Sequence, residues 1–273
     1  MKEKIEHSLQ LIRKASLIAD EMTPGHGLWV GFSGGKDSVC VLRLVQMAGV
    51  KYHAYYNVTG IDAPDSIYFI RDKFPEVTFV HPPKNYFKLV ENYGLPTMNR
   101  RFCCNKIKEN TGAGYVVLTG VRAEESRKRA AYTETRIFSR RKEHNGKGSN
   151  KDIDEVISSQ HQCIKGQDKL MIYPILQWTE DDVWQFIADE NLLVNPLYSV
   201  VGRVGCMFCP FASREQLEKY EELYPKAYRR LLLAIKRNLA IREDSYFSCA
   251  DEMYGWWKSK MPYSDYLRLR GSD

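Results

Sequence analysis

Hydrophobic residues along this chain follow two spacings, one typical of helices and one typical of buried strands. Over residues 4–21, apolar side chains recur every three or four positions, which predicts an amphipathic helix that ends before Pro24-Gly25. Helical spacing returns after Ser38 and over residues 66–74, 86–92 and 179–187. Short apolar runs predict buried strands at residues 28–32, 52–58, 77–80, 115–118 and 170–175.

This alternation predicts an α/β fold, with a doubly wound parallel sheet of about five strands and helices on both faces. We expect residues 1–200 to form this domain. Residues 201–273 are expected to form a helical, cysteine-containing region packed on it, because Ser213 opens a helical pattern that reaches about Arg242. Residues 139–151 are rich in charge, Asn, Gly and Ser without any period, which predicts a linker or mobile loop.

Composition narrows the class of protein. Hydrophobic residues make up 44% of the 273 positions, which excludes a disordered chain. No apolar run approaches the ~18 residues of a membrane span, and the charged N-terminus does not resemble a signal peptide, so we expect a cytoplasmic protein without a membrane partner. The net charge of +6 suits phosphate-bearing substrates. Seven cysteines without a secretory signal indicate metal or redox chemistry rather than disulfides.

A glycine-rich loop, Ser33-Gly34-Gly35-Lys36-Asp37-Ser38, joins the first predicted strand to a helix. Glycines let the backbone approach phosphate oxygens, and amides at a helix start direct N–H donors at an anion. Lys36 adds a positive charge, and Asp37 is expected to position Mg²⁺ or to order the loop. The alternative is an ordinary glycine turn, which the full motif at a strand-to-helix junction disfavours.

The loop resembles the pyrophosphatase loop of the adenine nucleotide alpha-hydrolase superfamily, whose members typically split ATP between its α- and β-phosphates. It differs from the P-loop of kinases and GTPases, whose two glycines are separated by four residues. The segments Thr59-Gly60-Ile61-Asp62-Ala63-Pro64-Asp65 and 119–129 resemble two elements of the phosphoadenosine phosphosulfate (PAPS) reductase-like family. Residues 174–184 are similar to that family's Pro-Leu-x-x-Trp…Asp-Val-Trp helix. The resemblance covers residues 27–210 and implies ATP with Mg²⁺ as the nucleotide.

The resemblance also implies a set of site residues. Arg122 and Arg129 are expected to hold phosphate or sulfate oxygens in forked hydrogen bonds. Lys36, Asp37 and Arg122 are the expected catalytic residues, because they would stabilise charge as pyrophosphate leaves. The expected nucleotide-binding residues are Ser33, Gly34, Gly35, Lys36, Asp37, Ser38, Thr59, Gly60, Gly120, Arg122 and Arg129.

The cysteines form a second constellation, with Cys103 next to Cys104 and a Cys-x-x-Cys pair at Cys206 and Cys209. Four thiolates hold either zinc or a [4Fe–4S] cluster. Adjacent cysteines favour the cluster, because they can bind two different irons, and the pattern resembles that of iron–sulfur adenosine phosphosulfate (APS) reductases. Zinc is the alternative metal. Cys163, near His161, is an alternative ligand, and Cys40 is expected in the core.

Two departures from the reductase pattern favour ATP-dependent chemistry. The reductases' C-terminal Glu-Cys-Gly-Leu-His segment has no counterpart here, where Cys249 is the only tail cysteine, and the loop keeps the lysine that reductases tend to lack. The leading hypothesis is therefore adenylation of an oxygen followed by cluster-assisted sulfur transfer, as in DNA phosphorothioation and tRNA thiolation enzymes. The alternatives are an APS or PAPS reductase that uses Cys249 and a thioredoxin-like reductant, and a non-catalytic nucleotide-binding subunit.

Nucleic acid is one candidate acceptor. Residues 122–147 contain nine Lys/Arg against four Glu, and Tyr254, Trp256 and Trp257 offer rings on which bases stack. The preferred alternative is that these aromatic residues pack within their own domain. The sequence leaves the acceptor, the sulfur donor and the oligomeric state open.

Overall fold

A computed structural model of the chain describes residues 1–109, 111–139, 148–160, 164, 166, 168–242 and 246–270. The chain forms two compact units. The sheet unit consists of Met1–Asn57, Tyr68–Val80 and Thr111–Asn195, and the cysteine unit of Val58–Ile67, His81–Asn110 and Pro196–Asp273. The cysteine unit therefore includes residues 58–67, 81–110 and 196–200, which the sequence prediction placed within residues 1–200.

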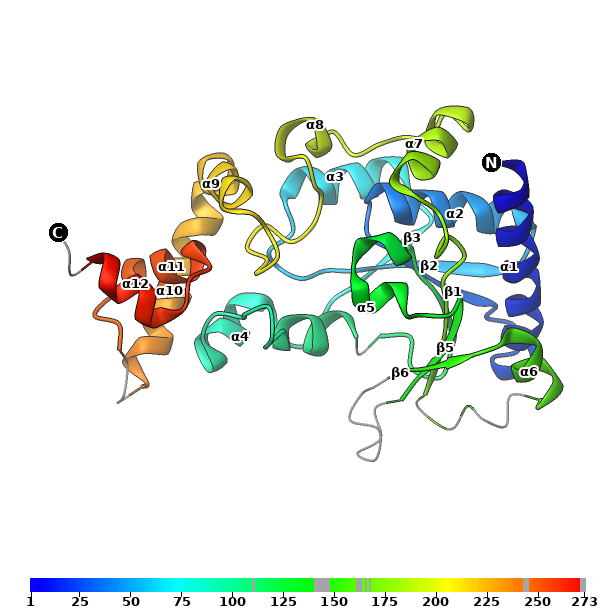
Figure 1. Cartoon of the computed structure of the whole chain (residues 1–273), viewed down its shortest axis with the longest axis horizontal. Helices are drawn as coiled ribbons and strands as arrows, with labels where there is room; N and C mark the ends of the chain where they lie inside the picture. The colour runs from blue at the N-terminus through cyan, green and yellow to red at the C-terminus, as the bar shows by residue number, and fades with distance from the viewer. Residues whose placement is uncertain are drawn as a thin grey trace. The chain divides into compact units, whose positions relative to one another are not determined.

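The sheet unit is built on a seven-stranded sheet with the order β3-β2-β1-β4-β7-β5-β6 (Figure 1). Strands β1, β2, β3, β4 and β7 are parallel, while β5 runs antiparallel to both β7 and β6. This mostly parallel sheet flanked by helices confirms the predicted fold class. The strands are β1 (Leu28–Phe32), β2 (Tyr52–Asn57), β3 (Val77–Val80), β4 (Val116–Leu118), β5 (Thr135–Phe138), β6 (Gly148–Lys151) and β7 (Lys169–Ile172).

The sheet has two strands more than the five or so that hydrophobic runs predict, namely β5 and β6. Strand β6 has the sequence Gly-Ser-Asn-Lys, in which no apolar residue marks a buried face. It is a strand because it pairs with β5, where Phe138 lies opposite Gly148. The expectation of a loop over residues 139–151 is therefore wrong for the last four of them. Residues 140–147 lie outside the described residues.

The order of the strands determines where a ligand can bind. From β1 the chain proceeds to β2 and β3 on one side, and then returns to place β4 and β7 on the other side. Val30 in β1 accordingly pairs with Ala54 in β2 and with Leu118 in β4. In doubly wound sheets, ligands bind beyond the carboxyl ends of the strands at such a reversal. The loops after β1 and β4 meet at this edge.

Helices cover the sheet because their apolar faces need burial. Helix α1 buries Ile12, Ala15 and Ala19 fully and packs against β1, β4 and α2, while α2 packs against β1 and α7. The long amphipathic helix predicted at the N-terminus is thus confirmed. The helices of this unit are α1 (Lys2–Met22), α2 (Lys36–Ala48), η2 (Ala123–Glu125), α5 (Arg127–Ala130), α6 (Ile153–Ser158), α7 (Glu180–Asp189) and the end of α3 (Pro64–Lys73).

The cysteine unit is helical. The Ser213 hydroxyl caps the start of the predicted long helical region, which consists of two helices, α9 and α10. Pro225 divides them, because proline disfavours helical backbone in the residue before it and is well suited to begin a helix. The helices of this unit are α4 (Tyr86–Tyr93), η1 (Cys104–Lys108), α8 (Leu197–Val201), α9 (Arg214–Leu223), α10 (Pro225–Ala240), α11 (Ala250–Ser259), α12 (Tyr263–Arg270) and the start of α3.

Aromatic side chains form the core of the cysteine unit. Tyr86, Phe208 and Tyr254 are almost completely buried, and Trp257 is 5% exposed. The preferred alternative for the tail aromatics, that they pack within their own domain, is therefore confirmed for Tyr254 and Trp257. No helix in the described part of the chain combines the length and the apolar character that crossing a bilayer requires.

Candidate functional site

The glycine-rich loop turns the chain from the end of β1 into the start of α2. Gly34 has a φ of +69°, and a Cβ added there would lie 2.8 Å from the Ile70 side chain, so the position requires glycine. The backbone N–H and the hydroxyl of Ser33 both bond to Ser38 Oγ at 3.1 Å. Ser38 Oγ in turn donates to the Gly35 carbonyl at 2.8 Å. The loop's own serines thus hold its shape around the N-terminus of α2, where backbone N–H groups favour an anion.

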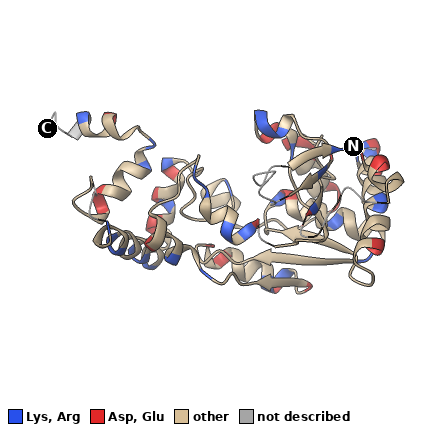
Figure 2. Ribbon diagram, turned by 90° about the horizontal axis from the view of Figure 1, so that it is seen from below, with Lys and Arg blue, Asp and Glu red and all other residues tan. Residues whose placement is uncertain are grey.

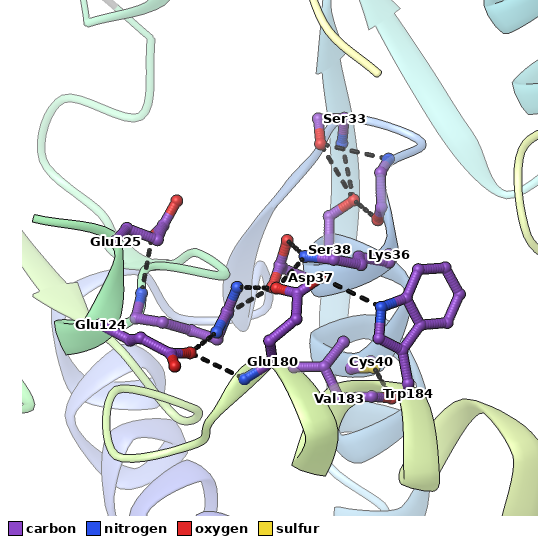
Figure 3. Close-up of polar contacts among 12 residues, drawn as sticks. Ser33, Lys36, Asp37, Ser38, Cys40, Glu124, Glu125, Glu180, Val183 and Trp184 are labelled. Atoms are coloured by element: carbon purple, nitrogen blue, oxygen red, sulfur yellow. Dashed lines mark hydrogen bonds and ion pairs between the residues drawn. The ribbon is translucent and has the colours of Figure 1, made fainter. Parts of the chain in front are cut away.

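Two buried cations and three carboxylates meet beside this loop (Figure 3). Lys36 Nζ lies 2.9 Å from Asp37 Oδ2 and 3.1 Å from Glu180 Oε2. Arg122 donates from Nε to Asp37 at 2.7 Å. Its Nη1 and Nη2 groups bond Glu124 at 2.7 Å and Glu180 at 2.5 Å. The structure therefore brings together Lys36, Asp37 and Arg122, the three residues predicted to be catalytic.

Electrostatics keeps these groups charged. Burial opposes the charged form of Lys36, which is 8% exposed, but the Asp37 and Glu180 carboxylates outweigh it and raise the pKa of Lys36. The pKa of Arg122 is raised by the same balance between burial and neighbouring carboxylates. Burial would raise the pKa of Glu180, yet its contacts with Lys36 and Arg122 outweigh burial and lower it. Lys36, Arg122 and Glu180 are therefore charged at neutral pH.

Sequence reasoning missed Glu124 and Glu180 as members of this site. Glu180 is the first residue of α7, whose start is capped by Thr179, and acidic residues in a first helical turn are explained by the helix dipole alone. The sequence does contain one local indication that Glu180 has a fixed position, because Trp184 follows it by four residues, one helical turn. In the structure Trp184 Nε1 donates to Glu180 Oε1 at 3.0 Å. Glu124 also bonds the Glu180 backbone N–H at 2.7 Å, which ties the loop after β4 to α7.

Gly120 and Arg129 occupy different environments. A Cβ added at Gly120 would lie 2.8 Å from the Asp37 carbonyl carbon and 2.9 Å from its oxygen, so the loop after β4 touches the backbone of α2. Arg129, on α5, pairs with Glu125, and its side chain is 37% exposed. The nucleotide contact proposed for Arg129 stays a prediction.

The Gly120 contact gives a stability prediction. Gly120→Ala is expected to lower the free energy of unfolding by about 1–3 kcal/mol, because the added methyl meets backbone rather than a movable side chain. Urea unfolding measures this change. Gly205→Ala is the matched control, since a Cβ there meets nothing within 4 Å. Equal stability of the two variants would show that the loop moves aside without cost.

Thr59 and Gly60 lie in the cysteine unit, where their motif folds beside Cys206. Asp62 Oδ2 accepts from the N–H groups of Thr59 and Gly60 at 2.6 and 3.3 Å. Asp62 also forms an isolated antiparallel bridge with Cys206, whose Sγ lies 3.8 Å from Thr59 Oγ1. Within its unit this motif positions Cys206. The nucleotide-binding role of Thr59 and Gly60 stays a prediction.

The four predicted ligand cysteines all belong to the cysteine unit and are half-buried. Cys103 and Cys104 hydrogen-bond to each other at the start of a π-helix, a wide turn that recurs at functional sites. Among the described residues, no three His, Cys, Asp or Glu side chains are arranged as a group able to hold a metal ion. The donor chemistry of four thiols matches a [4Fe–4S] site, and their role as ligands stays a prediction.

Two neighbouring groups indicate that the cysteines share one environment. Burial raises the pKa of Tyr86, and Cys103, Cys209 and Cys206 all add to that effect. The Cys206 thiol also lies beside Lys108, whose pKa it raises. Thiols from two distant segments of the chain therefore act on the same tyrosine, whose hydroxyl donates to the Phe208 carbonyl at 3.1 Å.

The remaining cysteines differ in setting. Cys40 is fully buried, its thiol donates to the Val183 carbonyl, and burial raises its pKa to about 12, which confirms it as a core residue. Cys249 is exposed and precedes α11. The alternative ligand Cys163, with His161, lies outside the described residues.

Comparison with known proteins gives one family match. The phosphoadenosine phosphosulfate reductase domain matches residues 27–212. An uncharacterised protein of Methanocaldococcus jannaschii is 26% identical over 86% of this chain and 54% of its own length. Sulfate adenylyltransferase subunit 2 of a Rhizobium species is 29% identical over 41% of this chain and 38% of its own length. The chain thus spans about half or less of the length of these relatives.

Solved structures resemble the chain at low identity. Phosphoadenylyl-sulfate reductase from Candida auris has a TM-score of 0.47 and 16% identity, covering 76% of this chain and 95% of its own. The U34-tRNA thiolase NcsA from Methanococcus maripaludis, which carries a [4Fe–4S] cluster, has a TM-score of 0.44 and 15% identity, covering 90% of this chain and 84% of its own.

Proposed function

The chain belongs to the phosphoadenosine phosphosulfate reductase domain family, and from this membership we propose that it activates an acceptor with ATP and then transfers sulfur to it. One observation carries the proposal. Lys36 and Arg122 meet beside a glycine loop that keeps its lysine, at the edge where β1 and β4 end. A site that binds a sulfonucleotide has no pyrophosphate to release and does not need this lysine.

In the proposed first step, an acceptor oxygen attacks the α-phosphorus of ATP. The bond from that phosphorus to the bridging oxygen breaks, and pyrophosphate leaves with the bonding electrons. Amides at the start of α2 would bind a phosphate, and Lys36 and Arg122 would stabilise the negative charge on the leaving group. The Mg²⁺ that accompanies ATP prefers carboxylate oxygens, which Asp37 and Glu180 supply. Mg·ATP would thus replace the internal ion pairs of the ligand-free site.

In the proposed second step, sulfide-level sulfur attacks the carbon that bears the adenylated oxygen, a C–S bond forms, and AMP leaves with the oxygen. A [4Fe–4S] cluster held by Cys103, Cys104, Cys206 and Cys209 would carry a thiolate on each iron, so it would supply an iron site for the sulfur donor once one of the four thiolates is released. Lys108 lies beside Cys206 and would offset the negative charge of thiolate ligands. Zinc on the same thiols would act as a structural metal instead.

A metal-dependence prediction tests the carboxylates. Glu180→Gln keeps the hydrogen-bonding shape but removes the charge, so the Mg²⁺ concentration for half-maximal activity is expected to rise about 10-fold or more. Asp181→Asn is the matched control, since Asp181 is the next residue of α7 and is exposed. An unchanged Mg²⁺ requirement in Glu180→Gln would mean that Glu180 serves only to hold Lys36 and Arg122.

The main alternative is reduction of APS or PAPS, which the family's name and the exposed Cys249 favour. The second is a non-catalytic nucleotide-binding subunit. The deciding experiment incubates the protein anaerobically with Mg·ATP and acceptor fractions, and separately with APS or PAPS and thioredoxin. Pyrophosphate and AMP from ATP, without sulfite, support the proposal. Sulfite from APS or PAPS overturns it in favour of a reductase, and ATP binding without turnover overturns it in favour of a subunit.

A further inference from the structure

Helix α10, in the cysteine unit, has one buried face and one strongly basic face. Within its 16 residues there is no Asp or Glu. In Figure 2, basic residues recur along this helix. The buried face consists of Leu231, Ala234, Ile235 and Asn238. The exposed cations are Lys226, Arg229, Arg230, Lys236 and Arg237.

A cavity lies between this face and α4. It has a volume of about 420 Å³ and contains three cationic side chains, Lys88, Arg230 and Arg237, with Glu91 as the one acid among its lining residues. Glu91 pairs with Arg237 at 2.7 Å and with Lys88 at 2.8 Å, so one carboxylate offsets only part of the charge of two cations. The cavity keeps a formal charge of +2, which suits a phosphate group.

The other cations of this face, which do not contact Glu91, are not neutralised by a carboxylate in the described part of the chain. The Arg230 guanidinium lies 4.4 Å from the centre of the Phe87 ring, a stacked position that orients its N–H groups. Within the described part of the chain, Lys226, Arg229 and Lys236 form no ion pair. Surface cations of a globular protein usually have acids nearby, and this helix offers none of its own.

We propose that the basic face of α10, together with the cavity beside α4, binds the phosphate backbone of a nucleic acid. Lys226 and Arg237 are eleven positions apart, which at about 1.5 Å per residue spreads the cations over about 16 Å. Along B-DNA, one strand presents a phosphate every ~3.4 Å, so a row of this length faces several phosphates at once. Contacts of this kind position a nucleic acid without reading its sequence.

The packing of α10 disfavours a membrane as the partner. A helix that lies on a bilayer inserts its apolar face between the lipids. Here Leu231, Ala234 and Ile235 are buried in the core of the unit, and Leu233 is the one large apolar side chain of the helix that is exposed, so the surface offers charge without an apolar face to insert. The inference concerns binding alone and holds whichever reaction the sheet unit catalyses. If both hold, a nucleic acid is the acceptor to test first.

The test measures fluorescence anisotropy of labelled single-stranded RNA, single-stranded DNA and duplex DNA between about 50 and 200 mM salt. The variant Lys226→Gln/Arg229→Gln/Lys236→Gln removes three cations. Duplex affinity is expected to fall on the order of 100-fold at about 0.1 M salt, with the slope of log K against log salt shallower by about 2 to 3. The matched control, Lys2→Gln/Lys51→Gln/Lys73→Gln, removes the same charge from exposed positions of the sheet unit.

Three outcomes would overturn the proposal. The first is that the wild-type protein binds none of the oligonucleotides at about 50 mM salt, where backbone contacts are strongest. The second is that the control triple variant loses as much affinity as the α10 variant, which would make net charge the cause. The third is binding to phosphatidylserine vesicles in place of oligonucleotides. Matching urea-unfolding midpoints for both variants would establish that neither result comes from misfolding.

Discussion

Lys36→Met is expected to lower the rate constant of ATP-dependent pyrophosphate release by at least about 100-fold, the loss that follows removal of one preorganised group that stabilises transition-state charge. Lys36 is 8% exposed and sits between Asp37 and Glu180. Methionine has a similar length but no charge, so the cluster would hold three carboxylates against Arg122 alone. That excess of negative charge would repel the triphosphate. Steady-state pyrophosphate release with saturating Mg·ATP measures the effect.

The control for this variant is Lys51→Met, at an exposed lysine of the same unit, which should leave pyrophosphate release unchanged. Comparable release from Lys36→Met and the wild-type protein would remove Lys36 from the mechanism. Urea unfolding separates loss of activity from loss of fold. In a pH series, Lys36 stays protonated at neutral pH because its pKa is raised. Its contribution to stability is therefore present below the unfolded value of 10.5 and is lost only as pH rises through the folded pKa.

Much of the sheet unit could be predicted from hydrophobic spacing, because buried parallel strands are continuous apolar runs. The family resemblance assigned Lys36 and Arg122 to one site, and the structure gives the physical reason, since loops after the neighbouring parallel strands β1 and β4 share one edge of the sheet. Strand β6 could not be predicted in this way. Its polar sequence becomes a strand through pairing with β5, and such an edge strand has little buried surface to leave a pattern.

The contacts of some site residues could not be predicted, because the same residue type at that position also has a purely structural explanation. Glu180 begins α7, where acids are common for reasons of helix stability, so its contacts with Lys36 and Arg122 leave no separate mark in the sequence. Thr59 resembles a nucleotide motif, yet within its unit it contacts the segment of Cys206. Pro225 is the opposite case. The break between α9 and α10 could have been predicted from this residue but was not, although proline begins helices more readily than it continues them.

Protein purified without oxygen is expected to contain iron and sulfide near four each per chain, with the broad visible absorption of a [4Fe–4S] cluster. Cys206→Ala is expected to lose most of both. Cys206 comes from a segment that Asp62 and Thr59 hold in place, and its thiol shares the environment of Tyr86 with Cys103 and Cys209. Replacing it removes one of the four proposed thiolate ligands, which is expected to weaken the hold on iron and sulfide. Iron, sulfide and zinc analysis with the spectrum measures the result.

Cys249→Ala is the matched control, because Cys249 is an exposed cysteine of the same unit outside the proposed ligand set. Iron retained in Cys206→Ala but lost in Cys249→Ala would contradict the assignment of ligands. Zinc without sulfide would contradict the cluster itself. In that case the thiols would serve as a structural metal site, and sulfur delivery would need another donor. The adenylation proposed for the sheet unit would be unaffected, because the ion pairs that join Lys36, Asp37 and Arg122 lie within that unit.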